Sequence, residues 1–428
     1  MATVGWRVFL SSFLLLVAAQ EAQAGNDEGI PIGIQASLLG GAVTARVSEA
    51  GAAWYNPAGI AHNDNTTVNL NVSVYGIDIR TNDSLIVTPD GTAAEAKFIN
   101  WKLVPSAFGV LRQVNKNLSV ALVMFVPVTT DYMLQTEAED ESGTYVAAAT
   151  TIGSSYYAGV SAGWRLLDNL RFGATVFGIY QSSYGSNVVS TNSDDRTLTN
   201  SGIQSESLYG LSVNTGFQWD ITKRQTLGMS IMTPSMILAS STSRTLVTET
   251  EAGQESSVTK NRDIDPYLFS PPKLRVGLHS RVGKKWEIDV DASFSSAVNS
   301  GQIPDAQGTL IDNPLARRFL WNVAVGGFYH HSEDMTFGSG LFSDRNPWLS
   351  GGLNFFGLTT GFRFKKDYKM EKGNLLTIES SIGGRYAYGS GGGATLAIDS
   401  DGSVEETVTE NSSRVHELSL NVGSAVHF

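Results

Sequence analysis

Residues 273–295 read KLRVGLHSRVGKKWEIDVDASFS, and this stretch decides the fold. On both sides of the turn at Gly283-Lys284-Lys285, apolar and polar side chains alternate with a period of two, which predicts two antiparallel β-strands. The polar positions of the first strand are mainly basic, and those of the second are mainly acidic. A solvated edge hairpin gives no reason for this segregation, whereas two strands that line a polar interior can pair their charges. The stretch therefore predicts neighbouring strands of a barrel whose polar faces point inward.

The same alternation recurs from residue 66 onward. It gives fourteen segments, near 66–79, 103–112, 118–127, 154–165, 170–182, 206–219, 226–236, 272–282, 286–296, 318–329, 335–343, 352–365, 373–387 and 414–428. Most gaps alternate between short turns and long stretches rich in Ser, Thr, Gly and Asp, such as 183–205, 237–271 and 388–413. Short turns at one rim and long loops at the other are typical of bacterial outer-membrane barrels. We therefore predict an all-β membrane fold, a 14-stranded antiparallel transmembrane β-barrel over residues 66–428.

Aromatic residues on the apolar parity mark both ends of these segments. One set lies near the short turns: Trp164, Phe172, Trp219, Trp286, Tyr329 and Phe364. The other set lies at the opposite strand ends: Tyr156, Tyr180, Tyr209, Phe294, Phe319 and Tyr386. Two girdles about eight residues apart bracket an apolar band of about 20 Å. This spacing fits an outer membrane, so the apolar parity is expected to face lipid.

Composition and the N-terminus restrict the other possibilities. Of the 428 residues, 17% are charged, and the net charge of −11 argues against nucleic acid as a partner. The absence of Cys excludes disulfides and thiolate metal sites. Arg7, the apolar run Phe9–Ala19 and the sequence Ala22-Gln23-Ala24 predict a signal peptide over residues 1–24, cleaved near Ala24. The alternative is an uncleaved anchor helix, for which the apolar run is short.

Residues 25–65 contain no clean alternation and are rich in small side chains. Positions 40–61 read GGAVTARVSEAGAAWYNPAGIA, in which Asn56-Pro57 is a turn signal that ends the short helical stretch before it. Small residues let backbone pack closely against backbone, so we expect residues 25–65 to form a hatch of short helices inside the lumen. A periplasmic tail is the alternative.

This stretch resembles the hatch signature of the FadL/TodX family of outer-membrane transporters, and Asn56-Pro57-Ala58-Gly59 is its most specific part. The export signal, the 14-stranded barrel and the C-terminal aromatic residue, Phe428, also fit that family, so the resemblance covers essentially the whole mature chain. It implies passive uptake of hydrophobic molecules, such as long-chain fatty acids or aromatic hydrocarbons, with a sideways exit through the wall. It also implies recognition of the C-terminal strand by the barrel-assembly machinery. Family members share a bend in the third strand at the exit, and here Pro127 is the only obvious interruption of that strand.

Strand 3 departs from the alternation, because both of its faces are apolar from Leu118 to Val126. An apolar patch in a polar lumen suits a hydrophobic ligand. We therefore identify Phe108, Leu122 and Met124 as candidates to face a ligand, Phe108 because it shares a parity with Arg112 on strand 2. Packing against the hatch alone explains the pattern equally well.

The hairpin at 273–295 predicts a ladder of ion pairs in the lumen. With the turn at Gly283-Lys284-Lys285, the strands pair in a defined register. The predicted pairs are Arg281 with Glu287, His279 with Asp289, and Arg275 with Asp291 along a diagonal.

Two further basic residues, Arg165 and Arg171, are expected to face inward close together near another short turn. Two like charges opposite one another require an anion. That anion is either a hatch carboxylate, such as Glu49, or a ligand.

Motifs for catalysis, cofactors or metals are weak. The string Gly159-Val160-Ser161-Ala162-Gly163 matches G-x-S-x-G, but that motif acts on a strand-to-helix turn, and Ser161 is predicted to lie in mid-strand. We therefore predict a monomeric channel with no catalytic residue, cofactor or metal, surrounded by outer-membrane lipid and lipopolysaccharide. The alternative is a barrel that anchors an adhesin or an enzyme through its long loops, and a general porin is a third possibility.

Overall fold

The computed structural model describes residues 26, 29–64, 66–193, 196–250, 256–262, 270–298, 302–304, 310–312, 317–348, 352–369, 375–399 and 404–428. The predicted signal peptide, residues 1–24, lies outside the described residues.

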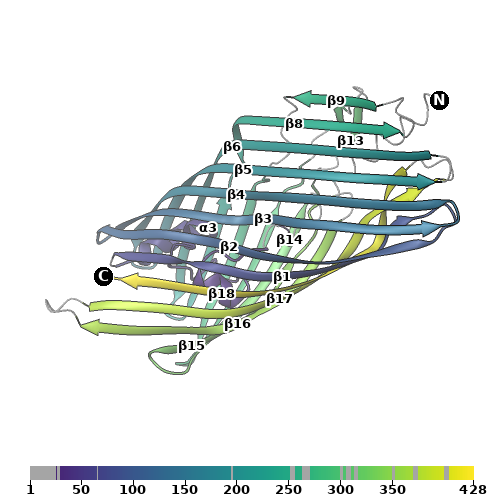
Figure 1. Ribbon diagram of the computed structural model, residues 1–428. Helices are drawn as coiled ribbons and strands as arrows, with labels where there is room; N and C mark the ends of the chain where they lie inside the picture. The colour runs from purple at the N-terminus through teal and green to yellow at the C-terminus, as the bar shows by residue number, and fades with distance from the viewer. Residues whose placement is uncertain are drawn as a thin grey trace.

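The described strands form a closed antiparallel barrel, as Figure 1 shows. Each of fourteen described strands pairs with the barrel strands before and after it in the chain, and β1 pairs with β18. The prediction of a 14-stranded barrel is therefore confirmed. The barrel strands are β1 (Thr67–Val87), β2 (Ala93–Asn115), β3 (Leu118–Asp140), β4 (Gly143–Leu167), β5 (Leu170–Ser193), β6 (Arg196–Thr222), β7 (Gln225–Met232), β10 (Lys273–Val282), β11 (Trp286–Ser295), β14 (Leu320–His330), β15 (Met335–Asp344), β16 (Gly352–Lys369), β17 (Leu375–Ile398) and β18 (Val404–His427).

Three stretches that the sequence predicts to be long loops contain further β-structure. The described strand residues of the stretches 183–205 and 388–413 belong to the far parts of β5, β6, β17 and β18. Within 237–271, β8 (Met236–Thr250) pairs with the far part of β6, and β9 (Ser256–Arg262) pairs with β8. A separate small hairpin joins β12 (Gln302–Pro304) to β13 (Leu310–Asp312). The loop predictions were wrong because Ser and Thr occupy both faces of these strands beyond the apolar band, so the period of two disappears.

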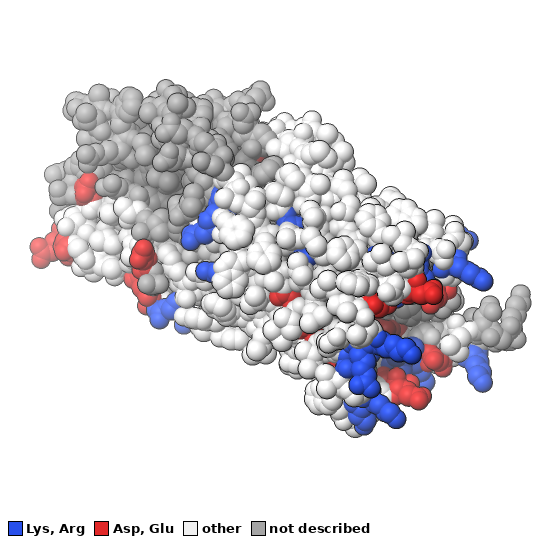
Figure 2. All heavy atoms as spheres, turned by 180° about the vertical axis from the view of Figure 1, so that it is seen from behind, with Lys and Arg blue, Asp and Glu red and all other residues white. Residues whose placement is uncertain are grey.

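Large apolar side chains face outward around the half of the barrel that carries the short turns. Girdle residues such as Trp286, Trp219 and Tyr209 are between 43% and 54% exposed, and Tyr156 stacks on Tyr180 with ring centroids 6.1 Å apart. Figure 2 shows Lys and Arg gathered at one end of the barrel, beyond a mostly uncharged surface. The outward parity is therefore the apolar one, as the alternation predicts. Among the described residues, no helix has the length and hydropathy needed to cross a membrane.

Residues 29–64, which we call the inner segment, lie inside the barrel near the short turns (Figure 1). They contain α2 (Ile34–Leu39), α3 (Ala52–Tyr55) and the 3-10 helix η1 (Pro57–His62). Helix α2 contacts β14 to β18, whereas η1 contacts β3 to β6 on the opposite side. Most side chains of the inner segment are buried because the wall surrounds them.

Candidate functional site

The inner segment rests directly on glycines of the wall. A Cβ atom at Gly173 would overlap the backbone of Pro57, one at Gly340 would overlap Leu39, and one at Gly228 would overlap Thr44. Only glycine allows backbone to approach so closely. Because these glycines lie on β5, β15 and β7, the inner segment is seated against widely separated parts of the wall.

The motif Asn56-Pro57-Ala58-Gly59 forms the turn between α3 and η1. The Asn56 side chain accepts a hydrogen bond from the Ala58 amide (3.2 Å) and caps η1, in which Pro57 is at the first turn. Its Nδ2 donates to the carbonyl oxygens of Thr44 (2.8 Å) and Phe217 (2.9 Å). One buried amide therefore joins two parts of the inner segment to β6.

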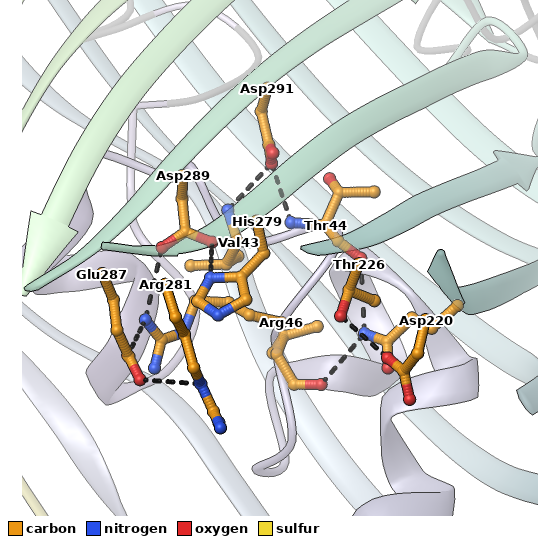
Figure 3. A network of polar contacts seen from close by, with 12 residues as sticks. Val43, Thr44, Arg46, Asp220, Thr226, His279, Arg281, Glu287, Asp289 and Asp291 are labelled. Atoms are coloured by element: carbon orange, nitrogen blue, oxygen red, sulfur yellow. Dashed lines mark hydrogen bonds and ion pairs between the residues drawn. The ribbon is translucent and has the colours of Figure 1, made fainter. Parts of the chain in front are cut away.

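Carboxylates of β11 hold the other side of the inner segment, as Figure 3 shows. Asp291 Oδ2 accepts hydrogen bonds from the amides of Val43 and Thr44, each at 2.8 Å. Arg46 Nη1 lies 2.7 Å from Glu287 Oε2 and 3.2 Å from Asp289 Oδ2. Arg46 is not among the residues predicted from the sequence, because no local pattern indicates that a residue of the inner segment reaches this strand.

The register of β10 and β11 pairs Arg281 with Glu287 and His279 with Asp289. The Arg281 Nε to Glu287 Oε1 distance is 3.4 Å, and the His279 Nδ1 to Asp289 Oδ1 distance is 2.9 Å (Figure 3).

The predicted diagonal from Arg275 to Asp291 is wrong. Gly277 lies opposite Asp291, and because it has no side chain, Thr44 approaches the wall there and its amide binds the carboxylate. Arg275 instead lies over the ring of Trp54, 5.8 Å from its centroid, and donates to the Trp54 carbonyl oxygen (3.4 Å).

Arg165 and Arg171 lie opposite one another on β4 and β5, but each has its own carboxylate. Arg165 Nη2 is 3.3 Å from Asp64 Oδ1, and Arg171 Nη2 is 2.9 Å from Asp220 Oδ2. Of the two anions predicted, a hatch carboxylate or a ligand, Arg165 has a hatch carboxylate, but it is Asp64 and not Glu49. Arg171 is paired with Asp220 of the wall, because that carboxylate lies at the same rim. Arg171 and Asp220 help to line a polar cavity of about 1060 Å³ at this end of the barrel.

Glu49 lies at the centre of the inner segment. Its Oε1 accepts a hydrogen bond from the Gln35 amide (2.7 Å). Burial raises the pKa of Glu49 to about 7, partly offset by the hydrogen bond from Gln35, and the charge of Glu379 raises it further.

The structure contradicts the candidate ligand-facing residues Phe108, Leu122 and Met124. These side chains are 42%, 60% and 46% exposed and point outward, and Phe108 is the register partner of Met124. The prediction failed because both faces of β3 are apolar, so the alternation does not distinguish inside from outside. The parity that Phe108 shares with Arg112 was also misleading. Arg112 lies near the short turn, outside the apolar band, where a charged side chain can face outward.

The inward face of β3 instead contributes to a cluster of aromatic rings. Trp54 of α3 makes edge contacts with Phe125 (6.3 Å between centroids), Tyr157 (5.1 Å) and Phe177 (6.0 Å). All four rings are buried, so α3 is held against β3, β4 and β5 by apolar packing.

The wall opens beside this cluster. Within the described residues, the ladder between β2 and β3 runs from Asn115 and Leu118 to Ala107 and Phe125 and then ends, although both strands continue. The ladder between β3 and β4 shifts register between Phe125 and Val128, around Pro127, which lacks an amide hydrogen. After this bulge the inward parity changes from odd to even positions.

The opening, which we call the window, is bounded at its far end by contacts between the two strands. The rings of Phe98 and Tyr132 are 5.0 Å apart, and Thr136 Oγ1 donates to the Glu95 carbonyl oxygen (3.3 Å). Six residues of β3 (126–131) and eight of β2 (99–106) therefore lie between the end of the ladder and the contact of Phe98 with Tyr132, a length of about 20–25 Å.

A cavity of about 930 Å³ hollows the outer face beside the window. Its lining, which we call the outer groove, is mostly apolar and includes Trp101 (73% exposed), Leu103 (65%) and Tyr75 (49%). Asp131 of β3 also lines it, so the groove reaches both edges of the window. Its volume is in the range of small-molecule sites.

Within the part of the chain that the structure describes, no group of three or more His, Asp and Glu side chains is arranged to hold a metal ion. Pairs of luminal charges such as Arg385 and Glu417, 2.8 Å apart, instead bind one another.

Comparisons with known proteins agree with this architecture. A family model described as outer membrane protein transport protein (OMPP1/FadL/TodX) matches residues 17–351. The fold is similar to that of a FadL homologue from Pseudomonas aeruginosa, with a TM-score of 0.60 and 15% identity over 92% of this chain and 97% of that chain. A monoaromatic hydrocarbon channel, CymD, gives 0.60 and 11% identity over 95% and 98% of the two chains. The toluene transporter TodX of P. putida gives 0.58 and 14% identity over 94% and 99%. No curated protein matches the chain.

Proposed function

From the premise that the chain belongs to the OMPP1/FadL/TodX family of outer membrane transport proteins, we propose that hydrophobic molecules leave its lumen sideways through the window between β2 and β3. The family consists of channels for hydrophobic compounds such as aromatic hydrocarbons, so the chain is an outer-membrane channel and not an enzyme.

The first support is the floor of the barrel. The inner segment acts as a hatch that closes the lumen, because it is seated on Gly173, Gly228 and Gly340 without space for a side chain. Beyond it lies a cavity lined by charged groups such as Arg46, Arg171 and Asp220. Entry of a hydrophobic molecule into this polar cavity is unfavourable in free energy, because the molecule would exchange apolar contacts for polar ones.

The second support is the window itself, and it is the observation that carries the proposal. An opening in a barrel wall leaves backbone groups without ladder partners, which is tolerated in a membrane only where a functional or structural feature covers them. Here the interruption begins at Pro127, next to the buried rings of Phe125 and Trp54. Its outer side leads to the outer groove at Trp101 and Leu103.

Toluene is the first substrate to test, because two proteins of similar fold are described as a toluene transporter and a monoaromatic hydrocarbon channel. A long-chain fatty acid is the second, by the likeness to the FadL homologue. An adhesin or an enzyme anchor would need neither a sealed hatch nor a window in the wall.

Cross-linking across the window tests the exit. The chain has no Cys, so the double variant Trp101→Cys/Asp131→Cys gives one specific pair, which a short bismaleimide can bridge. The matched control is Val110→Cys/Leu122→Cys, whose positions are register partners where β2 and β3 are already paired. Cells expressing each variant take up labelled toluene before and after the reagent.

We expect bridging at the window to reduce uptake to that of cells without the protein, and bridging at the control pair to leave uptake unchanged. Full uptake through a bridged window would disprove the sideways exit.

We further propose that residues 25–65 are the hatch and residues 66–428 the barrel, and that residues 1–24 are removed near Ala24. Within the outer membrane the partners are lipid and lipopolysaccharide, and the barrel-assembly machinery is proposed to read the strand that ends at Phe428. The channel is proposed to act as a monomer.

A further inference from the structure

A continuous row of aromatic rings covers the outer face of β11, β14, β15 and β16 near the short turns. Consecutive ring centroids are 4.7 Å apart for Trp286 and Tyr329, 6.4 Å for Tyr329 and Phe337, 4.8 Å for Phe337 and Phe362, and 6.3 Å for Phe362 and Phe364. Three of these side chains remain well exposed: Trp286 at 54%, Phe364 at 45% and Phe362 at 38%. The row is therefore a surface that contacts whatever surrounds the barrel.

Lysines lie directly beyond this row. Lys284 and Lys285 occupy the turn between β10 and β11, Lys365 and Lys366 lie near the end of β16, and all four are exposed. Lys285 Nζ is 5.8 Å from the Tyr329 ring centroid, which places one ammonium group next to the aromatic row. The whole surface, rings and lysines together, is called here the aromatic–lysine face.

The charge of this face differs in sign from that of the chain. Among the described residues, and including Lys369, this face carries five exposed lysines and three exposed acids, Glu333, Asp334 and Asp367. Asp367 already accepts a hydrogen bond from Thr377 (2.6 Å). The chain as a whole carries −11. Lysines are thus concentrated where the apolar band ends; at one end of the barrel Figure 2 shows a group of Lys and Arg side chains with Asp and Glu among them.

We propose that the aromatic–lysine face binds an anionic glycerophospholipid of the inner leaflet. The order of groups on the protein matches the order of groups in such a lipid. The rings contact the acyl chains and glycerol, and the lysines beyond them bind the phosphate. This inference rests on the membrane location of the barrel and does not depend on the window.

A second copy of the chain is the competing occupant. Two such faces packed around a two-fold axis would bring lysines of one copy against lysines of the other, which is unfavourable. An anionic lipid satisfies the same charges, and the observations therefore favour the lipid.

Native mass spectrometry of the detergent-purified protein tests the proposal. The protein is offered equal amounts of phosphatidylglycerol and phosphatidylcholine, and the retained lipids and the oligomeric state are recorded together. The test variant is Lys284→Gln/Lys285→Gln/Lys365→Gln/Lys366→Gln. The matched control is Lys223→Gln/Arg224→Gln, which removes two exposed cations from the short turn between β6 and β7.

We expect the unmodified protein and the control to prefer phosphatidylglycerol. In the test variant the ratio of bound phosphatidylglycerol to bound phosphatidylcholine should fall at least about fivefold, which is the contribution of a single lysine to the binding of an anionic lipid surface. Uptake of toluene should be equal in all three. Equal retention of the two lipids by the unmodified protein, an unchanged preference in the test variant, or a lipid-free dimer would each overturn the proposal.

Discussion

Replacing Glu49 by Gln should stabilise the inner segment above neutral pH. The amide keeps an oxygen that can accept the hydrogen bond from Gln35, but it carries no charge to bury. Burial raises the pKa of the Glu49 carboxyl from 4.5 to about 7, so the seated segment favours the protonated form. The corresponding stabilisation is complete below about pH 4.5 and is lost as the pH rises through about 7. The difference of about 2.5 in pKa corresponds to about 3 kcal/mol.

Hydrogen exchange measures this effect where it occurs. The amides of Trp54 and Tyr55 both donate to the Gly51 carbonyl oxygen at 3.0 Å, so their exchange reports opening of the inner segment. Between pH 5 and pH 8, and after correction for intrinsic exchange, the Glu49 carboxyl should lower the protection of these amides by about seventyfold in the unmodified protein. In Glu49→Gln this part of the fall should disappear. Groups that titrate elsewhere affect both proteins equally, so the comparison isolates Glu49.

The reasoning would be refuted by parallel profiles in the two proteins. That result would mean that the Glu49 carboxyl titrates with the same pKa in the open and seated segment, and that burial does not control its charge.

Three further predictions concern how the inner segment is seated. Gly173→Val should displace η1 and raise ion conductance in planar bilayers, because its side chain would overlap Pro57, whereas the control Gly384→Val, with nothing within 4 Å of its Cβ, should conduct as the unmodified protein does. Asn56→Ala removes hydrogen bonds to two carbonyl groups and should destabilise the seat by about 1–3 kcal/mol, with the same rise in conductance; an unchanged conductance would contradict this role. Arg46→Gln removes the arginine that Glu287 and Asp289 share and should cost about 1.5–3 kcal/mol, measured as faster exchange in the inner segment. The cost is limited because Arg281 and His279 stay paired with these carboxylates. Unaltered exchange would show that β11 does not hold the segment.

The sequence predicts the barrel well because its wall separates two environments. Lipid on one side and a polar lumen on the other impose a period of two, and a tight turn then sets the register. The hairpin at Gly283, whose φ of 68° suits glycine, pairs Arg281 with Glu287 for this reason.

The same reasoning fails where the two environments become alike. On β3 both faces are apolar, because Phe125 packs against Trp54 inside while Leu122 faces outward, and no periodicity distinguishes them. The contact of Arg46 with Glu287 could not be predicted either, since it depends on how closely the inner segment approaches the wall. Single glycines of the wall set this distance, and a glycine contributes no apolar or polar side chain to a sequence pattern.

The contacts of the inner segment also fix an order of events during assembly. Thr359 donates a hydrogen bond to the Leu38 carbonyl oxygen across 321 positions of the chain, and the Asn26 amide binds Asp344 across 318. Contacts between such distant positions require closure of a very long loop, which makes them slow to form. Asn26 and Leu38 thus find these partners only when β15 and β16 are in place. The part of the inner segment around α2 therefore completes its contacts after η1, whose partners β3 to β6 come earlier in the chain.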